Sequence, residues 1–108
     1  MSAEAFAALD VRVGRILRAE PNVPARKPAY KLWIDFGPLG ELRSSAQLTT
    51  HYTAAELAGQ LVLAAVNLGP RVIAGFTSEV LVLGVPDAEG EVILVVPERA
   101  APLGARLY

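Results

Sequence analysis

The chain has 108 residues, of which 53% are hydrophobic and 19% charged, with one histidine, no cysteine and a formal net charge of −1. These values exclude disulfides, thiolate chemistry, a metal site built from several histidines and a broadly basic nucleic-acid coat. The length predicts one domain over residues 1–108. The apolar fraction is slightly above that of an ordinary soluble domain, which favours a buried subunit interface.

The chain carries no recognisable targeting or membrane segment. No apolar stretch approaches the roughly 20 residues that span a bilayer. The first residues, "MSAEAFAALDVR", lack a basic region followed by an apolar core, as a signal peptide would have. Together with the absence of cysteine, this predicts a cytoplasmic protein.

Residues 2–9, "SAEAFAAL", predict a short helix capped by Ser2. Phe6 and Leu9 are three residues apart and therefore share one face of this helix. Because eight residues cannot hold a helix alone in water, that face has to pack on something. We expect it to pack on a second copy of the chain in a homodimer.

Short strands and a proline-rich loop follow. Val11 and Val13 alternate with Arg12, and Gly14 in mid-strand predicts a bulge or sharp bend. Residues 21–28, "PNVPARKP", contain three prolines and predict a loop. Residues 29–36 and 41–48 predict a hairpin around the turn "GPLG".

The alternation in this hairpin allows two arrangements. In one, Tyr30 faces the core and Trp33 faces outward, where it forms a stacking ring surrounded by polar donors. In the other, Trp33 fills the core and Tyr30 faces out. A base stacked on an aromatic side chain contributes about 1–3 kcal/mol, so the first arrangement predicts an RNA-binding face. Its residues are Lys31, Trp33, Arg43, Ser45 and Gln47.

The second half of the chain predicts one helical turn and more strands. Thr53 and Glu56 fit a capping box, and Gly59 ends the turn. Residues 61–67 predict a buried fourth strand, 72–78 a short extended piece, 79–85 a fifth strand and 91–97 a further strand. This order predicts an all-β, five-stranded OB-fold Greek-key barrel with a helical turn between strands three and four.

Several segments resemble the tRNA-binding OB domain found in extensions of aminoacyl-tRNA synthetases, and most closely its stand-alone CsaA branch of export-related chaperones. The segments are "DVRVGRI", "AYKLWIDFG", "RSSAQLT", "VNLGPRVIAGFTSEVLVLG" and the closing "GARL". The resemblance covers almost the whole chain. It implies an OB barrel, a homodimer, and binding of tRNA or of unfolded preproteins bound for the export machinery.

The resemblance also implies individual contacts to nucleic acid, at Lys31, Asn67, Arg71 and Ser78. Asn67 could pair with a base edge or could satisfy the turn that follows it. Pro70 fixes the backbone before Arg71, which is either aimed at the ligand or a solvated turn arginine.

The chain departs from the tRNA-binding pattern at two places. Ser45-Ala46-Gln47 replaces a Ser-Gly-Leu step, and Ser78-Glu79-Val80-Leu81 replaces a Ser-x-Gly-Met step. The second change brings an acid next to the expected RNA surface, and it favours the CsaA branch.

For the homodimer interface we expect Phe6, Leu9, Ile73 and Leu107. A peptide ligand could add to an exposed strand edge or lie in an apolar groove. A Ser-His-Asp triad at His51 is formally allowed, but its polar surroundings favour an exposed residue leading into a helix. Without an acid–base pair, metal ligands or a G-x-x-x-x-G-K loop, the sequence predicts neither an enzyme nor a cofactor or nucleotide site.

Overall fold

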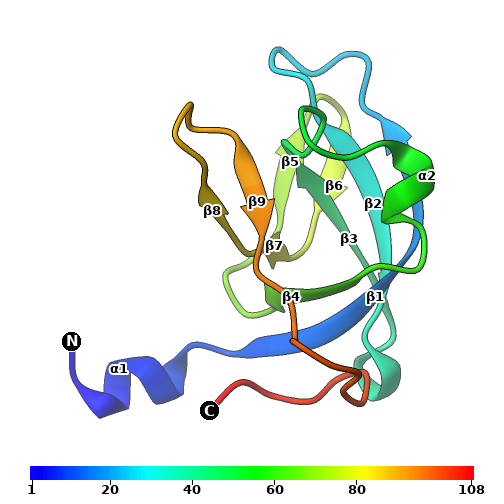
Figure 1. Ribbon diagram of the computed structural model, residues 1–108. Helices are drawn as coiled ribbons and strands as arrows, with labels where there is room; N and C mark the ends of the chain where they lie inside the picture. Colours follow the sequence, from blue (N-terminus) through cyan, green and yellow to red (C-terminus); the bar gives the residue numbers. More distant parts are fainter.

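The computed structural model describes all 108 residues as a small barrel with a protruding N-terminal helix (Figure 1). The two α-helices and one 3-10 helix are α1 (Ala3–Ala8), α2 (Ala54–Leu57) and η1 (Gly37–Leu39). The strands are β1 (Val11–Pro21), β2 (Tyr30–Asp35), β3 (Glu41–Ala46), β4 (Leu61–Ala65), β5 (Arg71–Ile73), β6 (Phe76–Ser78), β7 (Leu81–Val82), β8 (Gly84–Pro86) and β9 (Val92–Leu94). No helix has the length and apolar character needed to cross a membrane.

Five antiparallel strands form the barrel in the order β3-β2-β1-β4-β7. The long strand β1 pairs with β4 through its first half and with β2 through its second half. The barrel closes where the N–H groups of Glu79 and Val80 donate to the Arg43 carbonyl on β3. Helix α2 connects β3 to β4, so the predicted OB order is confirmed.

The core confirms the first of the two predicted arrangements. Tyr30 and the alternate β2 residues are buried, whereas Trp33 lies half-buried on the outer face. The Tyr30 hydroxyl donates to the Tyr52 carbonyl at 2.8 Å, which satisfies its polar end. The core cluster comprises Ile16, Tyr30, Leu32, Ile34, Phe36, Leu48, Leu57, Val62, Ala64 and Val80.

Of the bulge or sharp bend predicted at Gly14, the bulge is not at this residue. The register of β1 against β2 shifts between Ile16 and Arg18 instead. At Gly14, an added Cβ would lie 2.6 Å from Ile34 Cγ2 and 2.7 Å from the Phe36 ring. The glycine is therefore required because the core side chains of Ile34 and Phe36 pack directly against its backbone.

Residues 72–78 form a hairpin rather than one extended piece. β5 and β6 pair around Ala74 and Gly75, whose φ angles of 50° and 80° are both positive, as in a type I′ turn. The predicted fifth strand, 79–85, is split into β7 and β8, and the predicted strand over 91–97 is confined to β9. The β8–β9 pair is a second hairpin that stands out from the barrel (Figure 1).

Helix α1 is capped by Ser2 as predicted, since the Ser2 hydroxyl accepts from the Ala5 N–H. None of its residues is buried, but hydrogen bonds hold its C-terminal end. Asn67 Nδ2 donates to the Ala8 carbonyl at 2.8 Å, and Arg106 Nη2 donates to the Ala7 carbonyl at 2.6 Å. The helix is thus fixed in direction while its face stays uncovered.

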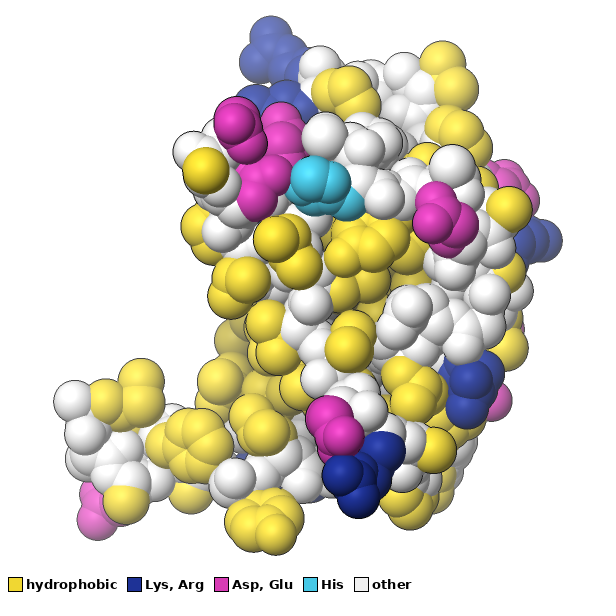
Figure 2. Space-filling view, in the orientation of Figure 1, with side chains coloured by type: hydrophobic (Ala, Val, Ile, Leu, Met, Phe, Trp, Pro, Cys, Tyr) yellow, Lys and Arg dark blue, Asp and Glu magenta, His cyan; other side chains and the backbone are white.

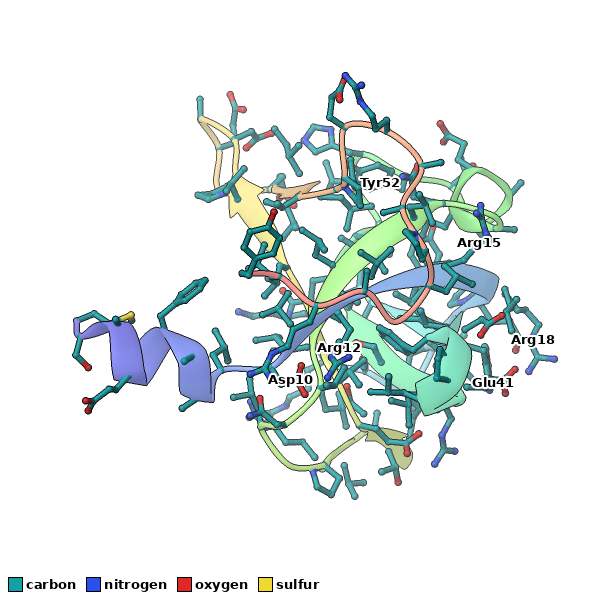
Figure 3. The ribbon with its side chains drawn as sticks, turned by 90° about the horizontal axis from the view of Figure 1, so that it is seen from below. Asp10, Arg12, Arg15, Arg18, Glu41 and Tyr52 are labelled. Atoms are coloured by element: carbon teal, nitrogen blue, oxygen red, sulfur yellow. The ribbon has the colours of Figure 1, made fainter.

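The C-terminal tail runs along the start of β1. The Val13 N–H donates to the Ala105 carbonyl, and the Leu107 N–H donates to the Val11 carbonyl. Asp10 links the tail to the start of β1, because its carboxylate lies 2.6 Å from Arg12 Nε and 3.5 Å from Arg106 Nε (Figure 3 shows Asp10 beside Arg12). The Arg12 hydrogen bond holds the pKa of Asp10 below its usual value.

Candidate nucleic-acid interface

An aromatic pair lies on the outer face of β2. The β5–β6 hairpin folds over β3, and it brings Phe76 against Trp33 with ring centroids 5.5 Å apart in an edge-to-face arrangement. Phe76 is buried, whereas Trp33 remains half-exposed. A rigid aromatic ring at the surface of an OB barrel is the group on which a nucleic-acid base stacks.

Three cations surround this pair. The Arg18 guanidinium lies 3.9 Å from the centroid of the Trp33 ring, while Lys31 Nζ and the Arg43 guanidinium lie 5.9 and 5.4 Å from that of Phe76. These distances are within the range of cation–π attraction. Arg18 reaches Trp33 because the register shift in β1 sets the two residues opposite each other, at the end of β1 far from Asp10 (Figure 3).

Two of these cations are already paired with carboxylates. Arg18 Nε lies 3.0 Å from Glu20, and Arg43 Nε lies 3.2 Å from Glu79. Lys31 makes no ion pair. The aromatic face therefore carries less free positive charge than its number of basic residues suggests.

Two grooves flank the β5–β6 hairpin. The first, about 460 Å³, lies between the hairpin and the proline-rich loop and includes Arg26, Lys27, Ser45 and Gln47. The second, about 240 Å³, includes Ser45 together with Arg71, Ser78 and Leu81. Ser45 and Ile73 line both grooves, so the two are neighbours separated by the hairpin.

The unpaired basic side chains gather around this hairpin. Of the ten Lys and Arg residues, five make ion pairs: Arg12, Arg18, Arg43, Arg99 and Arg106. Of the other five, Arg15 donates to the Gly59 carbonyl and does not line either groove. The remaining four line the grooves or cover Phe76: Arg26, Lys27, Lys31 and Arg71.

The structure brings together seven of the eight residues predicted to bind RNA. Asn67 is the exception, because both ends of its amide are used at the junction of α1 and β1. Ser78 lies near the others but is buried. Its hydroxyl accepts from the Ser45 N–H at 3.0 Å and donates to the Val80 carbonyl at 3.3 Å. The seven are Lys31, Trp33, Arg43, Ser45, Gln47, Arg71 and Ser78.

Three of the four residues predicted for a dimer interface also lie together. Phe6, Leu9 and Leu107 line an apolar groove of about 410 Å³ between α1 and the tail. Figure 2 shows hydrophobic side chains continuing along the hollow between α1 and the β8–β9 hairpin. Ile73 lies on β5, beside the basic grooves and apart from this surface.

His51 is exposed ahead of α2, as the sequence indicates, and it anchors the β8–β9 hairpin. Its Nε2 lies 2.7 Å from Asp87 Oδ2, and the Thr50 hydroxyl donates to Glu91 at 2.8 Å. The Glu91 N–H and then His51 lower the pKa of Asp87, which keeps this carboxylate ionised.

Sequence reasoning missed four residues of the basic and aromatic surface. Arg18 becomes a neighbour of Trp33 only through the register shift at Leu17, which no residue pattern marks. Phe76 follows Ala74-Gly75, where the glycine is a turn signal that distinguishes the observed hairpin from the single extended piece predicted over residues 72–78. Arg26 and Lys27 are adjacent basic residues in the proline-rich loop, and this basic pair is a sequence signal for a phosphate contact.

Comparison with known proteins identifies the family. The family model described as "Putative tRNA binding domain" matches residues 11–106. The chain belongs to this family. Within it, the chain is on the CsaA branch: chaperone CsaA of Bacillus anthracis is 47% identical with a TM-score of 0.93, covering 100% of this chain and 98% of that one. CsaA of Picrophilus torridus is 41% identical with a TM-score of 0.92, at 100% and 99% coverage.

The chain is also similar to part of a larger enzyme. It is 35% identical to methionine–tRNA ligase of Archaeoglobus fulgidus over 107 residues, which is 99% of this chain and 16% of that protein. The chain spans about one sixth of the length of such relatives, so the likeness concerns one domain of the ligase.

We predict that Ser78 stabilises the fold and that Ser45 does not. Ser78→Ala should lower the free energy of unfolding by about 1–3 kcal/mol, because it leaves the Ser45 N–H without its acceptor. Ser45→Ala keeps that N–H and should change stability by less than about 0.5 kcal/mol. Denaturant unfolding of both variants measures the difference, and equal stabilities would contradict the assignment.

Proposed function

We propose that this protein is a non-enzymatic tRNA-binding protein of CsaA type that also acts, as a homodimer, as an ATP-independent chaperone for unfolded preproteins awaiting export. The observation that carries the RNA part is the gathering of four unpaired cations around the β5–β6 hairpin, which also carries Phe76 of the aromatic pair, in a chain of the tRNA-binding family. We place the protein in the cytoplasm, where it would meet tRNA and the export machinery.

The two parts of the RNA surface would make different contacts. Phosphates are held by charge, and the free cations of the grooves can release counterions from the RNA backbone. Bases are held by stacking, and Trp33 offers a ring positioned by Phe76. Such contacts recognise shape and strand exposure more than base sequence, which suits a folded RNA with single-stranded ends.

We expect tRNA binding to weaken steeply with salt. Four phosphate contacts give a slope of log K against log [salt] of about −3, and Lys31→Gln or Arg71→Gln should each reduce its magnitude by about 0.7–0.9. Filter binding or anisotropy at several salt concentrations measures the slope. Arg99→Gln is the control, because Arg99 is highly exposed, paired with Glu98 and outside the grooves. Absence of any tRNA shift at low salt would refute this function.

The homodimer rests on the uncovered face of α1. Phe6 and Leu9 are 42% and 37% exposed, although hydrogen bonds from Asn67 and Arg106 fix the helix that carries them. A six-residue helix has little stability of its own, so an apolar face held in a fixed direction favours a protein partner. A second copy would bury the α1 face together with the groove beside Leu107.

We predict a light-scattering mass of about twice the 11.4 kDa chain at micromolar concentration. Leu9→Asp should shift the mass to that of the monomer, since a carboxylate cannot be buried unpaired in an apolar interface. Val23→Asp, an equal change in the exposed proline-rich loop, should leave the mass unchanged. A monomer mass for the unaltered protein would disprove the dimer.

The chaperone part rests on exposed apolar strands. Val85 and Ile93 face each other across the β8–β9 hairpin and are 50% and 42% exposed. Val95 and Val96 extend this surface after β9. Short exposed strands can bind an extended polypeptide by strand addition, and their apolar side chains can pack against the apolar side chains of that polypeptide. The CsaA chaperones are similar along the whole chain, which supports this role.

We expect a several-fold excess of the protein to slow aggregation of a chemically unfolded client without ATP. The double change Val85→Ser/Ile93→Ser should weaken this effect and leave tRNA affinity unchanged, because both residues lie outside the basic grooves. Turbidity measures the first effect and anisotropy the second. An unchanged aggregation curve with the unaltered protein would leave the alternative, a purely tRNA-binding module.

A further inference from the structure

Arg43 stands where a phosphate contact would be most useful. It lies opposite Trp33 in the β2–β3 register, its guanidinium is 5.4 Å from the Phe76 ring centroid, and its side chain is 41% exposed. A planar guanidinium beside an aromatic ring can bind phosphate with two hydrogen bonds while the base stacks next to it.

The Glu79 carboxylate already forms an ion pair with this guanidinium. One carboxylate oxygen of Glu79 accepts from Arg43 Nε at 3.2 Å and from the Arg43 backbone N–H at 3.1 Å. The Glu79 N–H in turn donates to the Arg43 carbonyl at 2.7 Å. Backbone bonds that close the barrel keep Glu79 beside Arg43, and its carboxylate has to give up both the Nε and the backbone N–H of Arg43 before phosphate can replace it.

We infer that Glu79 is an affinity-limiting residue of the RNA surface. It competes with phosphate for Arg43 and brings a negative charge close to any phosphate that approaches the aromatic pair. This inference rests on the proposed tRNA binding and adds to it one residue that weakens the interaction. The unpaired cations of the grooves are left to make the phosphate contacts.

The Arg18–Glu20 pair provides a contrast. It also neutralises an arginine next to Trp33, with a distance of 3.0 Å, but both side chains are more exposed than those of Arg43 and Glu79. No hydrogen bond to the backbone fixes the Glu20 carboxylate. A surface pair of this kind is weak, so phosphate displaces Glu20 at little cost.

The test is Glu79→Gln, which keeps an oxygen acceptor for the Arg43 N–H and removes the charge. Binding of tRNA at low salt should become about three- to tenfold tighter, and the salt slope should steepen by about 0.7–0.9, corresponding to one more phosphate contact. A thermal melt of the variant checks that the barrel is intact. Glu20→Gln should produce a much smaller change.

Two further variants make the result specific. Glu89→Gln removes the same charge in the β8–β9 turn and should leave tRNA affinity unchanged; an equal gain there would mean a general field effect and would overturn the inference. In an Arg43→Gln background, Glu79→Gln should give a clearly smaller gain, because only the repulsion between the carboxylate and phosphate is then relieved; an undiminished gain would also overturn the inference. If the unaltered protein binds tRNA and Glu79→Gln does not tighten it, the inference alone fails. If neither binds, the proposed function fails too.

Discussion

The hydrogen bonds that lay residues 78–80 along β3 are the constraint on which the rest of the structure depends. Ser78 accepts from the Ser45 N–H, and the Glu79 and Val80 N–H groups donate to the Arg43 carbonyl. The Ser44 hydroxyl, fully buried, donates to the Val80 carbonyl at 2.9 Å. These bonds close a barrel whose last strand, β7, has only two residues and could not close it alone.

The same closure builds the proposed RNA surface. Because residues 78–80 are fixed on β3, the β5–β6 hairpin before them has to fold over the outer face of the sheet. This brings Phe76 to Trp33 and opens one groove on each side of the hairpin. It also sets Glu79 against Arg43. Barrel stability and RNA affinity are therefore coupled through residues 78–80. The Glu79 carboxylate strengthens the contact with β3, but it also reduces the positive charge of the proposed RNA surface.

Much of the fold was accessible from the sequence because its signals are local. The alternation of Tyr30 and Trp33 and the capping box at Thr53 each depend on neighbours in the chain, and the structure confirms both. The need for glycine at position 14 and the position of Arg18 opposite Trp33 both depend on how neighbouring strands pack and pair, which no local sequence pattern indicates. Asn67 matched the tRNA-binding pattern, yet its amide is used by helix α1, a partner 59 residues away.

The two proposed binding surfaces would hold their ligands by different forces, and the chain passes from one to the other at Leu81. This exposed residue lines the groove of Arg71 and begins the segment that leads into the apolar β8–β9 hairpin. Salt acts on the two surfaces in opposite directions, since it weakens phosphate contacts, whereas excluded salts such as sulfate strengthen apolar burial. Ionic conditions would therefore shift the balance between RNA and polypeptide binding without any change in the fold. A basic patch and an apolar strand pair on one small barrel thus suit a protein that serves two classes of ligand.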